Sequence, residues 1–191
     1  FDCDALEVIE PILLTGEYTR TKQDFGQFDS PEPIVEALME RADIQPGMTV
    51  LEPSAGIGNI AKAAIERDAS VTAIEIDPKR YTELRNNNNA AEWNVNILEF
   101  ETEYKFDRVV MNPPFAKQAD IKHVLHAHKF LKSDGLLVSI MSASVTFREN
   151  KLTSDFRDFV YSKGGTIEPL PENSFKDSGT AVNTCIVTIP A

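Results

Sequence analysis

Apolar residues along the chain switch repeatedly between the spacing of strands and the spacing of helices. Short apolar runs rich in β-branched residues predict strands at residues 48–51, 71–76, 95–98, 106–111, 135–140, 165–169 and 182–189. Apolar residues three or four positions apart predict helices at residues 30–42, 60–65, 78–84, 119–131 and 150–161. This alternation predicts an α/β fold, in which helices cover both faces of a mostly parallel sheet.

Parallel sheets bind ligands at the carboxyl ends of their strands, so the loops that directly follow strands are the candidate site segments. These loops are residues 52–58, 75–78, 96–99 and 112–116. The first predicted helix has a typical start, because Ser30 can cap it and Pro31 suits its first turn.

Composition narrows the class of protein. The chain has 191 residues, 42% hydrophobic and 26% charged, which is typical of one globular domain. No apolar run is long enough to span a bilayer, so no membrane association is expected. The two cysteines, Cys3 and Cys185, have no metal-binding spacing, which favours a reducing, cytoplasmic setting.

The net charge of −11 argues against a protein that holds nucleic acid through a broad basic surface. The charge is uneven, however, and a basic strip follows the loop at 112–116. Its members are Lys117, Lys122, Lys129 and Lys132. Two interpretations of this strip stay open, a solvated helix face and a phosphate contact.

The stretch "VLEPSAGIGNIA", residues 50–61, places Gly56 and Gly58 between a strand and a helix. Glycines there let the backbone approach a ligand, although a plain tight turn would look the same. Glu52 at the strand end would repel phosphate and attract an ammonium group, which favours a ligand with an amino-acid end. The other candidate binding residues of this turn are Pro53, Ser54 and Asn59.

The next strand ends in Glu75, about twenty residues after the glycines, where an acid can accept hydrogen bonds from ribose hydroxyls. Ile76 beside it could lie on an adenine face, and Asp77 is interpreted as a helix cap before Pro78. A ligand with an ammonium group at one end and adenosine at the other matches S-adenosylmethionine.

The order of these segments, with Asn112-Pro113-Pro114-Phe115 after the fourth strand, resembles the class I S-adenosylmethionine-dependent methyltransferases that act on exocyclic amino groups. It is most similar to DNA adenine-N6 methyltransferases of the phage and mobile-element type. Phe28, Ser30 and Pro31 match their helix-opening Phe-x-Thr-Pro motif, with Ser for Thr, and the resemblance assigns these three residues to cofactor binding. The resemblance implies a Rossmann-like, seven-stranded, mostly parallel sheet with helices on both faces and an antiparallel last strand.

The same resemblance divides the chain into an N-terminal helical or extended segment, residues 1–23, and a catalytic domain, residues 24–191, with no separate target-recognition domain. A specificity subunit or a homo-oligomer could supply recognition. The family's third motif normally holds an acid that receives the cofactor's adenine amino group. Asn96-Ile97 stands there, and the amide oxygen of Asn96 can accept that bond.

The resemblance assigns catalysis to residues 112–115. The side-chain oxygen of Asn112 and the backbone carbonyl of Pro113 would accept hydrogen bonds from the target amino group, and this stabilises the positive charge that builds on nitrogen. Pro113 and Pro114 lock the backbone, so both acceptors are held before substrate arrives. Phe115 would stack on the target base, which must be single-stranded or flipped out of a duplex.

The predicted reaction is methyl transfer to adenine N6 in DNA, which leaves S-adenosylhomocysteine. Alternatives are the same chemistry on ribosomal or transfer RNA or on a protein glutamine, and a cofactor-binding subunit without catalysis. Residues 175–184 would form either the rim of the base pocket or a plain β-hairpin. No metal is expected, because the three histidines at positions 123, 126 and 128 lack a carboxylate or cysteine to complete a ligand set.

Overall fold

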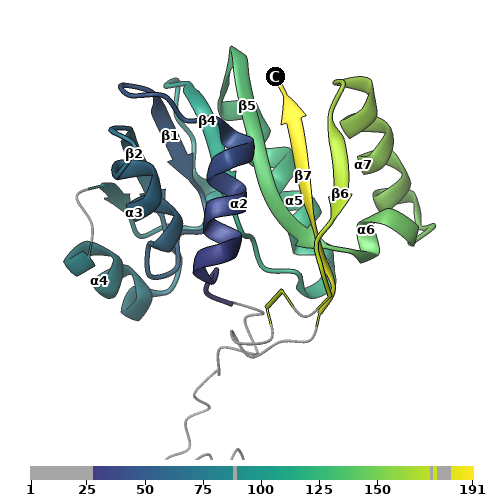
Figure 1. Ribbon diagram of the computed structural model, residues 1–191, viewed down its shortest axis with the longest axis horizontal. Helices are drawn as coiled ribbons and strands as arrows, with labels where there is room; N and C mark the ends of the chain where they lie inside the picture. The colour runs from purple at the N-terminus through teal and green to yellow at the C-terminus, as the bar shows by residue number, and fades with distance from the viewer. Residues whose placement is uncertain (1–27, 88–89, 173, 176–181) are drawn as a thin grey trace, which may run out of the picture.

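A computed structural model describes residues 28–87, 90–172, 174–175 and 182–191, as drawn in Figure 1. Its α-helices are Glu32–Ala42 (α2), Asn59–Ile65 (α3), Pro78–Asn87 (α4), Ala119–Ala127 (α5), Ser144–Phe147 (α6) and Lys151–Ser162 (α7). Its strands are Thr49–Glu52 (β1), Ser70–Ile74 (β2), Ala91–Trp93 (β3), Phe106–Met111 (β4), Leu131–Ser142 (β5), Thr166–Pro169 (β6) and Thr184–Pro190 (β7). Short 3₁₀ helices are Ile97–Glu99 (η1), Ala116–Gln118 (η2) and His128–Phe130 (η3).

The strands form one seven-stranded sheet in the order β3-β2-β1-β4-β5-β7-β6. Neighbours from β3 to β5 pair in parallel, and β7 runs antiparallel to both β5 and β6. The predicted α/β fold, with its mostly parallel sheet and antiparallel last strand, is therefore confirmed.

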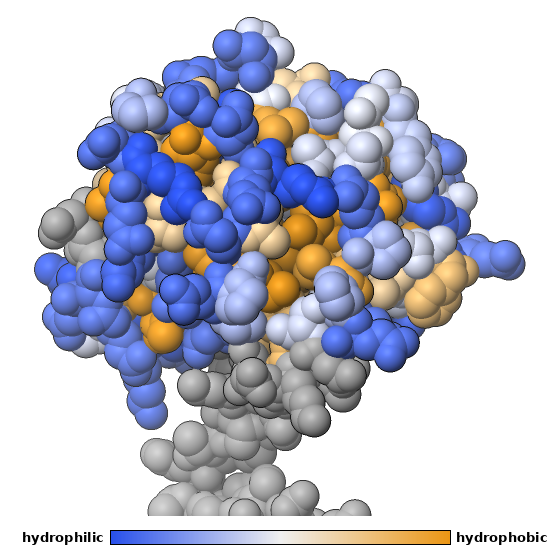
Figure 2. All heavy atoms as spheres, in the orientation of Figure 1, coloured by the Kyte–Doolittle hydropathy of each residue, from blue (hydrophilic) through white to orange (hydrophobic). Residues whose placement is uncertain are grey.

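Two apolar layers lie on opposite faces of the sheet (Figure 1). One is built with α2 and α3, whose buried residues include Leu38, Met39 and Ala64, and the other with α5 and α7, which bury Ile121 and Phe156. On the face drawn in Figure 2, hydrophobic surface lies beside α2, over β5 and β7. Within the described residues, no helix has the length and apolar character that a membrane crossing requires.

A partly buried carboxylate aligns the two central strands that lead to the candidate site. Asp107 Oδ2 on β4 accepts hydrogen bonds from the backbone N–H of Thr49 at 2.8 Å, from Thr49 Oγ1 at 2.7 Å and from Lys132 Nζ at 2.8 Å. Burial would raise the pKa of Asp107, but these hydrogen bonds outweigh it and hold the pKa at about 2. The charged carboxylate thus joins β1, β4 and β5 at the edge opposite their carboxyl ends.

Some local predictions were wrong. The strand expected at 95–98 is η1, which starts where Asn96 Oδ1 accepts from Leu98 N, and the edge strand is β3 instead. Ser30 does not cap α2, because the cap position is Pro31 and no side chain accepts a capping bond there. Residues 1–23, predicted as a separate segment, and most of the predicted rim at 175–184 lie outside the described residues.

Candidate active site

The carboxyl ends of β1, β2 and β4 converge on a cavity of about 250 Å³. Ten of the predicted site residues line it: Phe28, Pro53, Ser54, Gly56, Glu75, Ile76, Asn96, Ile97, Asn112 and Pro114. A smaller adjoining cavity is lined by three more of them, Ser30, Glu52 and Asn59. Sequence reasoning therefore identified loops that the fold brings to one place.

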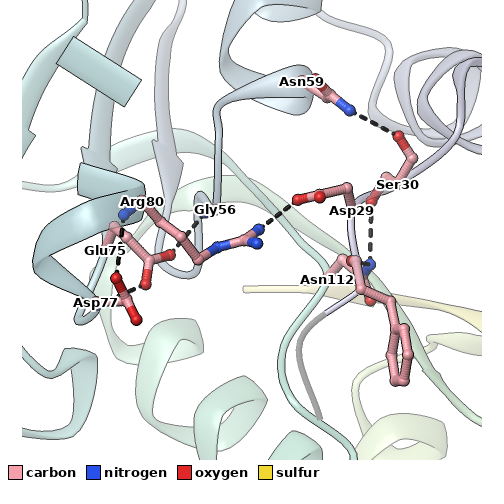
Figure 3. Close-up of polar contacts among 9 residues, drawn as sticks. Asp29, Ser30, Gly56, Asn59, Glu75, Asp77, Arg80 and Asn112 are labelled. Atoms are coloured by element: carbon pink, nitrogen blue, oxygen red, sulfur yellow. Dashed lines mark hydrogen bonds and ion pairs between the residues drawn. The ribbon is translucent and has the colours of Figure 1, made fainter. Parts of the chain in front are cut away.

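The glycine-containing turn after β1 is bound to the tip of β2 by a carboxylate. Glu75 Oε2 accepts from the backbone N–H of Gly56 at 2.7 Å, and Glu75 Oε1 accepts from that of Asp77 at 2.8 Å (Figure 3). Burial raises the pKa of Glu75, and these two backbone hydrogen bonds lower it by less, so the pKa stays above its usual value. Asp77 Oδ1 in turn accepts from the backbone N–H groups of Lys79 and Arg80, so Asp77 caps α4 as predicted.

Glu52 is a buried acid with an unused acceptor. Glu52 is 1% exposed, and its Oε2 has no hydrogen-bond partner among the described residues. Burial raises the pKa of Glu52 well above its usual range, the backbone N–H of Ala61 lowers it, and the neighbouring Glu75 carboxylate raises it. A cation with N–H donors would satisfy the oxygen and neutralise the carboxylate, so Glu52 fits an ammonium group.

Arg80, on the first turn of α4, is a site residue that sequence reasoning missed. Its guanidinium reaches over the turn to an ion pair with Asp29 (Figure 3). It passes so close to Gly56 that a Cβ there would collide with Nη2, and Gly56 also has a φ of +59°. The positive φ is the reason that position 56 favours glycine, and a side chain there would also displace the guanidinium. The pairing of Arg80 with Asp29, 51 residues earlier in the chain, leaves no signal in the local sequence.

Asn112 follows β4, and both hydrogens of its amide are bound by the segment before α2. Asn112 Nδ2 donates to the backbone carbonyl of Phe28 at 3.1 Å and to Ser30 Oγ at 3.0 Å (Figure 3). A carbonyl only accepts, so the nitrogen of the amide must face Phe28. The side-chain oxygen points the other way, and no described residue donates to it.

Apolar groups form the other wall of the larger cavity. Ile76 is 52% exposed, although isoleucine is normally buried, and Ile97 lies on the same lining. His123 of α5 also lines this cavity, with its Nδ1 3.5 Å from Ser54 Oγ. Burial and nearby His126 lower the pKa of His123 to about 4, so its ring is neutral at pH 7.

Other predicted residues lie beside the cavities without lining them. Gly58 precedes α3 with a φ of +91°, and Pro31 precedes α2. Pro113 is buried, and Phe115 packs on the apolar layer of α2 and α3. The remaining histidines diverge, since His126 contacts the carbonyl of Phe100 and His128 that of Pro190.

The sequence model of the methyltransferase small domain family matches residues 25–164, most of the chain. The chain belongs to this family. S-adenosylmethionine is the methyl donor of the family, and the structure offers it a suitable site. The glycine turn would allow close backbone approach. Glu52 Oε2, which has no partner among the described residues, would accept an ammonium group, and Ile76 with Ile97 would offer an apolar surface for a base.

Two relatives of this chain have names that describe different substrates or roles. A probable ribosomal RNA small subunit methyltransferase A of Methanosarcina mazei is 34% identical over 113 residues, 55% of this chain and 41% of that protein. The modification methylase CviBIII of Paramecium bursaria Chlorella virus NC1A is 26% identical over 216 residues, 90% of this chain and 55% of that protein. The chain thus spans about half the length of these two relatives.

A solved structure supports the fold of the methyltransferase. The modification subunit of a putative type I restriction enzyme from Vibrio vulnificus YJ016 superposes with a TM-score of 0.72 at 18% identity. The match covers 98% of this chain and 48% of that subunit. At this identity the likeness concerns the fold, which is that of class I methyltransferases.

Proposed function

We propose that this protein transfers a methyl group from S-adenosylmethionine to an exocyclic amino nitrogen of a nucleobase, with adenine N6 in DNA as the favoured target. The observation that carries the proposal is the orientation of Asn112. Its Nδ2 is bound to Phe28 and Ser30, which leaves its oxygen as an acceptor beside the donor cavity. A fixed, uncharged acceptor suits an amino group that becomes positively charged during the reaction.

The chain's own residues hold the acceptor nitrogen for a direct transfer of the methyl group. The amino lone pair forms the new N–C bond, the S–C bond of the donor breaks, and its sulfonium becomes a thioether. Asn112 Oδ1 and the Pro113 carbonyl accept from the amino N–H groups and keep the lone pair localised. The extra proton then leaves the nitrogen for water.

The donor's parts match separate groups around the cavity. Its ammonium group is assigned to Glu52, whose Oε2 has no partner among the described residues, and its ribose to Glu75. Its adenine is assigned to Ile76 and Ile97, with Asn96 receiving the adenine amino group. Asn96 Oδ1 already accepts from Leu98 N, and a carbonyl oxygen has a second lone pair for this bond.

DNA is favoured because the likeness to the viral modification methylase extends over 90% of this chain. RNA is the second candidate, since the 34% identity to the probable ribosomal RNA methyltransferase is higher over a shorter stretch. In either polymer the base has to leave its stack to enter the cavity, and Phe115 is proposed to stack on it. Target selection by a partner subunit or a second copy stays a prediction.

The test is transfer of tritiated methyl groups from S-adenosylmethionine to separate DNA, RNA and protein fractions. We expect label in DNA that digests to N6-methyl-2′-deoxyadenosine. Asn112→Ala should lower the rate by about 10²–10³-fold, the usual cost of removing one preorganised polar group from a site of developing charge. Donor affinity, measured by calorimetry, should stay within about twofold, because the reacting nitrogen belongs to the other substrate.

The matched control is Asn87→Ala, which removes an exposed amide at the end of α4 and should change neither quantity. Label in RNA alone would show that RNA, and not DNA, is the substrate. Label in protein alone would contradict the nucleobase proposal. Donor binding with no transfer to any fraction would instead support a non-catalytic subunit.

A further inference from the structure

Arg80 is buried, but its ion pair with Asp29 uses only one of its three side-chain nitrogens. The residue is 8% exposed, and one nitrogen, Nη2, is paired with Asp29. The other two nitrogens, Nε and Nη1, are buried and have no hydrogen-bond partner among the described residues. An unsatisfied buried donor costs about 1–3 kcal/mol, and more when it is charged, so such a group in a cavity wall indicates a ligand acceptor.

The neighbourhood of Arg80 is otherwise acidic. The described lining of the two cavities contains Asp29, Glu52 and Glu75, and Arg80 is its only group with a full positive charge, since His123 is neutral. A carboxylate that entered these cavities would be repelled by the three acids and attracted by Arg80 alone.

Glu52 and Arg80, which carry groups of opposite charge, therefore both line the smaller of the two cavities. Within the described part of the chain, Glu52 supplies a carboxylate oxygen without a partner, and Arg80 supplies N–H donors without partners. The amino-acid end of the donor is a zwitterion with an ammonium and a carboxylate on the same carbon. One acid and one guanidinium are the complement that such an end needs.

We propose that Arg80 binds the carboxylate of the donor's amino-acid end, while Glu52 binds its ammonium group. Arg80 is then the residue that makes the site specific for a donor with an intact carboxylate. This inference rests on the proposed use of S-adenosylmethionine. Asp29 positions the guanidinium by holding Nη2, and Gly56 leaves the room in which it crosses the turn.

The test compares S-adenosylmethionine with decarboxylated S-adenosylmethionine, which lacks only the carboxylate, by calorimetric titration. Wild-type protein should bind the decarboxylated compound roughly 10–100-fold more weakly, as expected for loss of charge-assisted hydrogen bonds. Arg80→Gln should weaken S-adenosylmethionine by a similar factor and leave the affinity for the decarboxylated compound within about twofold. Arg80→Lys should recover part of the preference, because it restores the charge without the planar donors.

Lys79→Gln is the matched control, because it removes the same charge from an exposed neighbour on α4 and should leave both affinities unchanged. Equal binding of the two ligands by the wild-type protein would overturn the inference without any variant. An Arg80→Gln protein that binds both ligands more weakly by the same factor would also overturn it, since that indicates a purely structural role.

These outcomes are distinguishable from failure of the proposed function. If the protein prefers the carboxylated donor but methylates no nucleic acid, the Arg80 assignment is supported and the proposed substrate is contradicted. If the protein methylates DNA but binds both ligands equally, the proposed function is supported and the Arg80 assignment is contradicted. A protein that binds neither ligand contradicts both.

Discussion

The three residues of the 28–30 segment bind two different groups of the candidate site. The backbone of Phe28 and the hydroxyl of Ser30 bind the Asn112 amide, and Asp29 between them binds Arg80. Alternate residues of this short stretch thus contact the groups assigned to the acceptor base and to the methyl donor. The stretch precedes Asn112 by more than eighty residues along the chain.

Ser30→Ala removes one of the two acceptors that fix the Asn112 amide. We expect the methyl-transfer rate to fall about 2–10-fold, which corresponds to one hydrogen bond of about 0.5–1.5 kcal/mol. Donor affinity should be unchanged, because the Asp29–Arg80 ion pair remains. Single-turnover kinetics measures the first quantity and calorimetry the second.

Ser30→Thr is the control, because it keeps the hydroxyl. It should retain most of the wild-type rate. An alanine variant as fast as the threonine variant would show that the backbone carbonyl of Phe28 alone is enough to orient the amide.

At the scale of elements, the start of α4 connects the sheet to the donor cavity. Glu75 accepts the backbone N–H of Asp77, and Asp77 accepts two N–H groups of the first turn, including that of Arg80. The Asp77 cap therefore fixes the N-terminal end of α4. The first turn of this helix holds Arg80, whose guanidinium crosses over Gly56.

Asp77→Ala should destabilise the protein by about 0.5–2 kcal/mol, the usual cost of losing an N-cap. For a protein of this size, each kcal/mol lowers the melting temperature by roughly 2–4 °C. Donor affinity should fall as well, since the first turn that presents Arg80 loses its anchor. Thermal melts and donor titrations of the variant check both effects.

Asp77→Asn retains a capping oxygen and should melt within about 1 °C of the wild type. If the alanine variant lost stability and kept full donor affinity, the position of Arg80 would not depend on the cap.

Periodicity predicted most of the elements because the strands and helices around the core have buried faces of regular spacing. It failed at β3, since three residues, two of them exposed, are too few to carry an alternating pattern. It also failed for Arg80, which follows Lys79 on a polar helix and looks solvated in sequence. Burial of Arg80 depends on Asp29, 51 residues away, and such distant pairing leaves no local signal.

For the whole molecule, the buried acids determine how stability depends on pH. Burial raises the pKa of Glu52, of Glu75 and of Asp120, the last to about 6. A carboxyl with a raised pKa in the folded state stabilises the protein fully below its unfolded value. That contribution is lost as the pH rises through the folded pKa. Without donor, these groups should therefore lower the free energy of unfolding between about pH 4 and pH 7.

The cationic end of the donor should reverse this trend, because it favours the ionised form of Glu52. We expect S-adenosylmethionine to raise the melting temperature more at pH 7.5 than at pH 5, where protons compete with the ammonium group. Thermal melts with and without donor at the two pH values measure the effect.

Asp120→Asn provides the control, because Asp120 bonds to the backbone of Ser142 and Ile121, outside both cavities. It should flatten the pH dependence of the ligand-free protein between about pH 4 and pH 6 and leave the donor-dependent shift unchanged. A donor-induced shift of equal size at both pH values would argue against an ionised Glu52 in the complex.

The proline after Asn112 has a consequence for the lifetime of the protein. Asparagine side chains deamidate when the nitrogen of the next residue attacks the amide carbon and closes a five-membered imide. Pro113 has no N–H to give up, so this route is closed at Asn112, the amide assigned to the methyl-transfer step. Conversion to aspartate would set a carboxylate oxygen against the carbonyl of Phe28. The rigid dipeptide thus protects the site against slow chemical ageing as well as holding its geometry.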